Sequence, residues 1–294
     1  MTRIRRSTIL FQAAVLLAWL GAGTWLTGCT RVFFMPSSVV RVHPEDVGAL
    51  YESVRFSSAD GTPLTGLFFP ARRSPAHGCV VHFHGNAENM NSHFLFASWL
   101  VDHGFHVFVF DYRGYGESGG APRLGKVIED GVAAIRHVRS RPDVDPSRVA
   151  VFGQSLGGAI AVAALARMQD TGVRALVLES TFSSYSRVAQ DKMARLIVLW
   201  PVQWPLSRLL FTTRHDPEHH LERLPAVPVL VIHGDEDRVV PFQEGERIFR
   251  LAREPKEFWR IRGGGHTEAF TRFGREYRPR LSEFLRKAME GRLP

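Results

Sequence analysis

The sequence has few cysteines, no repeats and no dense basic stretches, and each of these absences argues against one class of protein. Its 294 residues include only two cysteines, Cys29 and Cys79, which argues against a fold held together by disulfides. No internal repeat is present, which argues against a solenoid or a propeller. The net charge is +8, but no basic stripe is interleaved with aromatic residues, so we expect no nucleic-acid partner.

A cluster of metal ligands is also missing from the sequence. His82 and His84 have the spacing of a ligand pair, but no further ligand cluster follows them. We therefore expect neither a metal ion nor an organic cofactor. Hydrophobic residues make up 45% of the chain and charged residues 22%, which is typical of a globular protein and excludes global disorder.

The N-terminus has the pattern of a secreted and lipid-anchored protein. A positive region with three arginines precedes an apolar stretch at 9–20, as in a secretory signal peptide. The next motif, Leu26-Thr27-Gly28-Cys29, resembles a bacterial lipobox, in which the cysteine is acylated and becomes the first mature residue. We predict a signal peptide at 1–28, lipidation at Cys29 and anchoring to a membrane of the bacterial cell envelope.

Two other interpretations of the N-terminus are weaker. A single membrane helix is the main alternative, but Gly21 and Gly23 interrupt an apolar stretch that is barely long enough to span a bilayer. A twin-arginine signal is the second, but Arg5 and Arg6 lack the rest of that pattern. Residues 29–50 contain scattered prolines and serines, and we expect them to form a tether in front of a domain at 51–294.

Apolar runs and helical patterns alternate through this domain. A hairpin is expected from residues 51–56 and 64–69, which flank the turn signal Asp60-Gly61. Further strands are expected at 79–83, 105–110, 149–152, 175–178, 229–232 and 258–261, and helices at 91–101, 127–139, 159–168, 242–252 and around 284–285. Strands that alternate with helices predict an α/β fold with a mostly parallel central sheet flanked by helices.

The stretch Gly153-Gln154-Ser155-Leu156-Gly157 carries the strongest functional signal. It spells G-x-S-x-G between an apolar strand and an apolar helix, which is the context of a nucleophile elbow. The turn needs small neighbours because it holds the serine in a strained backbone conformation. We therefore predict that Ser155 is a catalytic nucleophile at a helix N-terminus, where partial positive charge favours a developing oxyanion.

A serine nucleophile needs a base and a group that orients the base. His266 follows the last expected strand behind three glycines, and Asp237 follows the strand before it. The order serine, aspartate, histidine is the one found in α/β-hydrolases. We assign His266 as the base and Asp237 as the acid. Asp235 is the competing acid, and otherwise it would brace its own loop.

The tetrahedral intermediate needs two N–H donors around its negatively charged oxygen. We expect one from Leu156, directly after the nucleophile, and the other from the loop after the 79–83 strand, at Asn86 or at Ala87.

Five segments together resemble the α/β-hydrolase superfamily, closest to its small serine hydrolases related to depalmitoylating and monoacylglycerol-type enzymes. They are His84–Glu88, Asp111–Ser118, Gly153–Gly158, His233–Asp237 and Gly264–His266. The resemblance covers roughly residues 50–290 and implies the α/β-hydrolase fold with a small helical cap. It also implies a serine hydrolase that cleaves carboxylic ester or thioester bonds of acyl or lipid-like substrates, such as palmitate esters or thioesters.

The cap is expected at about 181–225, between two strands. Its segment 193–211 is unusually apolar and carries Trp200 and Trp204. It is either a lid packed on the core or an acyl-binding lid whose tryptophans touch the membrane interface. Two further functions stay open: a serine peptidase with the same triad, and a non-catalytic envelope binding protein.

Overall fold

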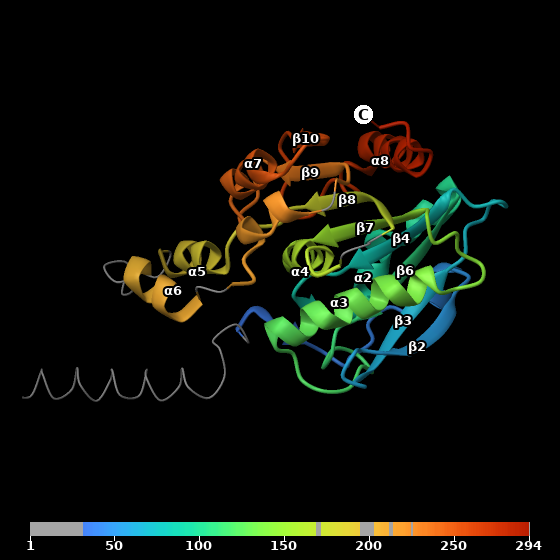
Figure 1. The fold of residues 1–294 in the computed structure, drawn as a ribbon, viewed down its shortest axis with the longest axis horizontal. Helices are drawn as coiled ribbons and strands as arrows, with labels where there is room; N and C mark the ends of the chain where they lie inside the picture. Colours follow the sequence, from blue (N-terminus) through green and yellow to red (C-terminus); the bar gives the residue numbers. More distant parts are fainter. Residues whose placement is uncertain (1–31, 169–171, 195–202, 212–213, 225, 294) are drawn as a thin grey trace, which may run out of the picture.

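A central sheet of eight strands organises the domain in the computed structural model, which describes residues 32–168, 172–194, 203–211, 214–224 and 226–293 (Figure 1). The spatial order of the strands is β10-β9-β8-β7-β4-β6-β3-β2. Their bounds are β2 Glu52–Ser57, β3 Pro63–Phe69, β4 Gly78–Phe83, β6 Phe105–Asp111, β7 Val149–Gln154, β8 Val173–Glu179, β9 Val229–Gly234 and β10 Lys256–Ile261.

The sheet is mostly parallel, as predicted. Only the pairs β2–β3 and β3–β6 are antiparallel, and the other five neighbouring pairs in the sheet run parallel. The hairpin β2–β3 lies where the sequence predicts it, with Phe56 opposite Leu64. Gly61 in its turn has a φ of 80°, a conformation that glycine adopts without strain.

Both faces of the sheet are covered by helices, which explains the continuous apolar runs of its strands. Along β7, Val149 and Val151 join one hydrophobic cluster, whereas Ala150 and Phe152 join another. The helices of the first cluster include α3 Leu124–Arg139, α4 Leu156–Leu165 and α7 Phe242–Leu251. On the other face lie α8 Gly274–Met289 and the short segments between β4 and β6.

The prediction of one continuous helix at 91–101 is wrong. The chain instead forms a single turn, α2 Met90–His93, and two 3₁₀ segments, η3 Phe94–Phe96 and η4 Ser98–His103. Phe94, Ala97 and Leu100 are all fully buried and three residues apart. That spacing matches the three residues per turn of a 3₁₀ helix, so this geometry keeps them on one face.

The segment predicted to be a tether lies against the domain from Phe33 onward. A two-residue strand, β1 Met35–Pro36, pairs in parallel with β5 Ala87–Glu88 of the loop after β4. The 3₁₀ segment η2, Pro44–Val47, follows it, and the hydroxyl of Tyr51 donates a hydrogen bond to Glu45. The predicted signal peptide and Cys29 lie outside the described residues.

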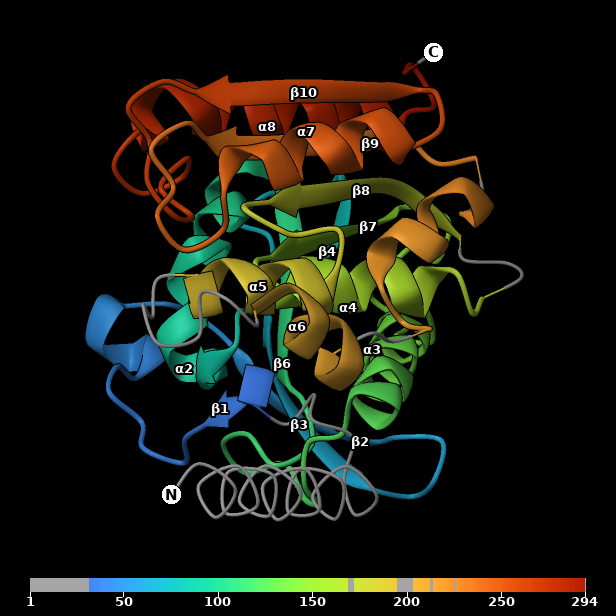
Figure 2. The same ribbon diagram turned by 90° about the vertical axis from the view of Figure 1, so that its left-hand side faces the viewer.

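The cap comprises two helices and two 3₁₀ segments between β8 and β9. They are α5 Tyr185–Ala194, α6 Gln203–Phe211, η6 Pro217–His219 and η7 Leu221–Arg223. Figure 2 shows α5, α6 and β1 on the same side of the molecule. Across the described parts of the chain, no helix has both the length and the apolar character needed to cross a membrane.

Candidate active site

Ser155 sits in the sharp turn between β7 and α4. Its backbone has φ 52° and ψ −121°, a conformation that L-residues rarely adopt and that costs on the order of 1–3 kcal/mol. Its N–H donates to the carbonyl of Glu179 on the neighbouring strand at 2.9 Å. The residue is buried, and its position puts the hydroxyl at the N-terminus of α4.

The glycines of the motif allow the close approach of backbone that this turn requires. A Cβ on Gly157 would lie 2.1 Å from the carbonyl oxygen of Phe83, and one on Gly153 would lie 2.5 Å from the Cα of Gly158. Both distances are far inside van der Waals contact, so any side chain would push α4 away from β4 or open the turn. The G-x-S-x-G pattern therefore has a steric cause in this fold.

Asp237 and His266 form a direct pair. Oδ2 of Asp237 is 2.7 Å from Nδ1 of His266, and Oδ1 accepts hydrogen bonds from the N–H groups of Val239 at 2.8 Å and Val240 at 2.9 Å. Burial opposes the ionisation of Asp237, but these hydrogen bonds outweigh it and lower the pKa of the carboxyl group below its usual value. The ionised carboxylate therefore holds the Nδ1–H tautomer of His266 and leaves Nε2 free to accept a proton.

Asp235 contacts other groups. Its Oδ2 accepts from Nε of Arg260 at 2.9 Å, and its Oδ1 accepts from the N–H of Gly263 at 2.7 Å. These bonds join the loop after β9 to the loop after β10. Asp235 therefore braces the loop that carries the histidine, whereas Asp237 contacts the histidine itself.

Sequence reasoning missed Glu179, which links the serine turn to the histidine loop. Its carbonyl accepts from Ser155, and its Oε1 accepts from the N–H of Ala269 at 3.1 Å. Gln154 donates to Oε2 at 2.7 Å and contacts Nε2 of His82 through its own Oε1 at 2.9 Å. Burial raises the pKa of Glu179 to about 7. An available signal was its place as the first polar residue at the C-terminal end of a buried strand.

Ser180 supports the histidine loop from the same strand end. Its hydroxyl accepts from the N–H of Thr267 at 3.1 Å. Ser180 and Thr267 both have positive φ values, 50° and 55°, so each side of this contact is held in a rarely populated conformation. Such backbone persists only where neighbouring contacts stabilise it.

The loop predicted to supply the second oxyanion donor lies beside the serine. A Cβ on Gly85 would be 4.0 Å from the Cβ of Ser155, so Asn86 begins directly next to the nucleophile. Leu156 is the first residue of α4, and the first N–H groups of a helix have no partner within it. The structure thus brings Leu156 and the Asn86 loop to the same side chain.

His82 and His84 are both buried, and their rings contact different groups, with Nε2 of His82 beside Gln154. His84 uses Nδ1 to contact the carbonyl of Gly85 at 2.8 Å. Within the described ranges, Asp216, Glu218 and His219 have ligand spacing. However, Asp216 accepts from Ser184 and Tyr185, and Glu218 is paired with Arg187 and Arg247. The carboxylates of this group already have cationic or hydrogen-bonding partners.

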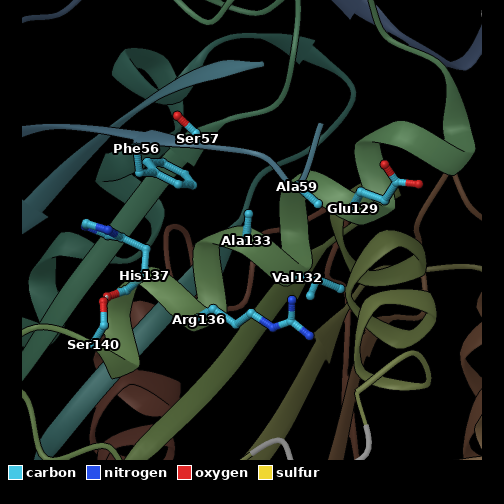
Figure 3. Close-up of a pocket in the computed structure, with 9 residues that line it drawn as sticks. All are labelled: Phe56, Ser57, Ala59, Glu129, Val132, Ala133, Arg136, His137 and Ser140. Carbon is cyan, nitrogen blue, oxygen red and sulfur yellow. The ribbon is translucent and has the colours of Figure 1, made fainter. Parts of the chain in front are cut away.

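A hollow of about 380 Å³ lies away from these residues, between β2 and α3. Figure 3 shows its lining, which includes Phe56, Val132, Arg136 and His137. Because β2 is the edge strand of the sheet and β7 is internal, this hollow is remote from Ser155. None of its lining residues belongs to the serine turn or to the histidine loop.

Within the cap, α6 exposes apolar surface. Trp204 is 54% exposed and Leu209 is 75% exposed, and the guanidinium of Arg208 lies 4.4 Å from the centre of the Trp204 ring. Trp200 lies outside the described residues.

Comparison with known proteins places these features in a family. Residues 74–225 match the family model described as serine aminopeptidase, S33. The chain is 39% identical over 242 residues to "Uncharacterized protein YfhR" of Escherichia coli K12, covering 81% of each sequence. It is 31% identical to "Alpha/beta hydrolase domain-containing protein WAV2" of Arabidopsis thaliana, covering 84% of this chain and 82% of that protein.

Solved structures share the fold. The Pyrococcus furiosus esterase Pf2001 superposes with a TM-score of 0.71 at 21% identity, covering 87% of this chain and 98% of that one. Acetyl xylan esterase 1 from Thermoanaerobacterium superposes with a TM-score of 0.60, also at 21% identity, and covers 82% and 84%. At this level of identity the likeness confirms the predicted fold class.

Proposed function

Because the chain belongs to the α/β-hydrolase superfamily, in the family described as serine aminopeptidase S33, we propose that it is a serine hydrolase acting on carboxylic esters or thioesters of acyl substrates. The observation that carries this proposal is the strained backbone of Ser155 at the start of α4. Strained residues of this kind cluster at active sites, and Ser155 combines the strain with a position at the N-terminus of a helix.

The proposed mechanism begins with Ser155. Its Oγ attacks the acyl carbonyl while Nε2 of His266 accepts the hydroxyl proton. The N–H groups of Leu156 and of Asn86 or Ala87 stabilise the oxyanion of the tetrahedral intermediate. Asp237 accepts a hydrogen bond from Nδ1 of His266 and stabilises the imidazolium that forms.

The second half of the cycle reverses these roles. The imidazolium gives its proton to the leaving alcohol or thiol, and the bond between the acyl carbon and the leaving group breaks. His266 then accepts a proton from a water molecule that attacks the acyl-enzyme. Collapse of the second tetrahedral intermediate releases the carboxylic acid and returns the proton to Ser155.

Labelling with a fluorophosphonate probe tests this proposal directly. We expect the purified protein to react with the probe and to hydrolyse p-nitrophenyl esters. The preferred acyl length in a panel of such esters would show how long an acyl chain the binding pocket accepts. A chain that neither reacts nor hydrolyses any ester in the panel would instead be a binding protein with the same fold.

A second candidate is a peptidase with the same triad. The description of the matching family model names an aminopeptidase, which supports this candidate. Aminoacyl p-nitroanilides and p-nitrophenyl esters of matched side chains separate the two. We expect kcat/KM to favour the esters, and a clear preference for the anilides would identify a peptidase.

We also propose that the protein is anchored in the cell envelope through Cys29. Met35 lies six positions after Cys29, so the anchor lies at most roughly 20 Å along the chain from β1, given about 3.5 Å per residue. Since β1 pairs with the loop that follows β4, the anchor would hold the active-site side of the domain close to the bilayer.

The anchoring proposal predicts that Cys29→Ser blocks acylation. We expect the variant to leave the membrane fraction or to accumulate as an unprocessed precursor, because a soluble domain loses the acyl chains that bind it to the bilayer. Mass spectrometry of the N-terminus measures the change. An unmodified Cys29 that is still preceded by Gly28 in the wild-type protein would refute the anchor.

The exposed surface of α6 leads to a prediction for the cap. We expect Trp200→Ala combined with Trp204→Ala to reduce activity on long-chain substrates in vesicles, because tryptophan favours the headgroup region of a bilayer. Activity on short soluble esters should change little, since the triad is untouched. Trp204→Phe, which keeps an apolar ring, serves as the matched control.

Two results would contradict this role of the cap. Equal losses on vesicle-borne and soluble substrates would indicate that the tryptophans pack on the core. Unchanged activity on both would indicate that they take no part in substrate choice.

A further inference from the structure

The N-terminal segment Phe33–Val39 contacts the proposed active site directly. The N–H of Met35 donates to the carbonyl of Asn86 at 2.8 Å, and the N–H of Ser37 donates to the carbonyl of Glu88 at 3.1 Å. These bonds form the two-stranded parallel pair β1–β5, separate from the central sheet. The loop that carries the proposed oxyanion donors therefore pairs with residues about 50 positions earlier in the chain.

The segment after β6 contacts both this loop and the N-terminal segment. The hydroxyl of Tyr115 donates to the carbonyl of Asn86 at 2.7 Å, so this oxygen accepts two hydrogen bonds. Tyr115 is itself fully buried. The neighbouring Gly116 donates its N–H to the carbonyl of Ser37 at 3.1 Å, which ties the segment after β6 to the N-terminal segment.

Asn89 also binds the N-terminal segment. Its side-chain amide donates to the carbonyl oxygens of Ser37 at 3.0 Å and Val39 at 2.9 Å, while its Oδ1 caps α2 by accepting from the N–H of Asn91. Asn89 is fully buried. Between these contacts Glu88 has a φ of 61°, a conformation rare for a residue with a side chain, and the neighbouring hydrogen bonds stabilise it.

The same segment also contacts the cap. The ring of Phe33 lies 5.0 Å from Tyr185 and 5.6 Å from Phe211, measured between ring centres and with edge-to-face geometry in both cases. Tyr185 begins α5 and Phe211 ends α6. Phe33–Val39 therefore joins the oxyanion loop to both helices of the cap.

Holding the carbonyl of Asn86 also fixes the orientation of the N–H groups next to it. The carbonyl of Asn86 and the N–H of Ala87 lie in one rigid plane, so holding the oxygen also orients that N–H. It also restricts the rotation of Asn86 itself, whose own N–H follows Gly85 beside the nucleophile. The N–H groups of Asn86 and Ala87, the two candidates for the second oxyanion donor beside Leu156, are thus oriented through one oxygen atom.

We propose that Phe33–Val39 is part of the active site, in which the Met35 N–H and the Tyr115 hydroxyl are positioning groups that orient, through the Asn86 carbonyl, the oxyanion donor supplied by Asn86 or Ala87. This inference rests on the proposed serine hydrolase function. Pre-organised donors contribute to catalysis because they need no reorganisation when charge develops.

Met35 offers a matched pair of variants. Its side chain is 54% exposed, so Met35→Ala removes surface atoms and keeps the N–H, whereas Met35→Pro removes the N–H. Residue 35 is already extended and is followed by Pro36, so proline suits the local backbone. Rates are to be expressed per active site, titrated with the fluorophosphonate probe, so that loss of folded protein does not count as loss of rate.

We expect Met35→Pro to lower kcat on a short soluble ester by about tenfold to a hundredfold, less than the loss of a whole oxyanion donor. KM should change little. The affinity for a trifluoromethyl ketone, whose adduct with the serine places an oxyanion in the hole, should fall by a similar factor. Met35→Ala keeps the N–H, so it should retain a higher kcat and a higher ketone affinity than Met35→Pro.

Tyr115→Phe is the second variant, since it removes the other donor to the same carbonyl and keeps the ring. We expect it to lower kcat and ketone affinity in parallel as well, and it keeps the proposal testable if Met35→Pro does not fold. Equal kcat and ketone affinity in Met35→Pro and Met35→Ala, or no change in Tyr115→Phe, would overturn the proposal. A wild-type protein without labelling or turnover would instead refute the serine hydrolase function itself.

Discussion

Ser155→Ala is expected to abolish fluorophosphonate labelling and to lower kcat by roughly 10⁴-fold to 10⁶-fold, the range seen when a serine hydrolase loses its nucleophile. The substitution removes a single oxygen atom and leaves the turn, the histidine loop and both hydrophobic clusters unchanged. The residual rate would come from the oxyanion donors and substrate binding alone.

The control for this experiment is a serine outside the site. Ser140 is exposed at the end of α3, where its hydroxyl donates to the carbonyl of His137. Ser140→Ala should keep full labelling and full turnover. Circular dichroism and the Tm of both variants report whether the fold is retained. Near-wild-type esterase activity in a folded Ser155→Ala protein would refute the mechanism.

Asp237→Asn should lower kcat by about 10³-fold to 10⁴-fold, because the variant loses the carboxylate that holds the histidine tautomer. An asparagine amide can donate a hydrogen bond to Nδ1 of His266, which places the proton on Nε2. Nε2 could then no longer accept the proton of Ser155. The positive charge that forms on the imidazole would also lose its neighbouring carboxylate.

Asp235→Asn is the matched comparison two residues away. Asparagine keeps an acceptor for the N–H of Gly263 and loses only the charge partner of Arg260, whose side chain is 58% exposed. Ion pairs of this exposure contribute little to stability, so we expect a small change in kcat. If Asp235→Asn proved the more damaging of the two, the acid would have to be reassigned to Asp235.

The order of strands and helices could be predicted because the signals are local. Apolar runs such as Val149–Phe152, bounded by turn residues, predict buried strands wherever they occur in the chain. The turn Asp60-Gly61 and the glycines around Ser155 are likewise constrained by their own backbone geometry. The helix predicted at 91–101 is the exception, because apolar spacing of three and of four residues is hard to separate over a few turns.

The location of the candidate site also followed from local signals. Ser155, Asp237 and His266 each come directly after a strand, and parallel strands end at the same edge of a sheet. The sequence alone therefore determined the fold class and the three residues to test. It did not decide whether Asp237 or Asp235, both in the loop after β9, is the acid that orients the histidine.

Only the tertiary structure decided which groups touch. Asp237 contacts His266, Asp235 contacts Arg260 and Gly263, and Glu179 contacts both Ser155 and Ala269, the second of which is 90 residues away in the chain. The contact between Met35 and Asn86 is also known only from the structure, because the composition of residues 29–50 is that of a tether. The physical reason is that a hydrogen bond depends on distances within a few tenths of an ångström between atoms on different loops. Those distances arise only when the sheet brings the loops together.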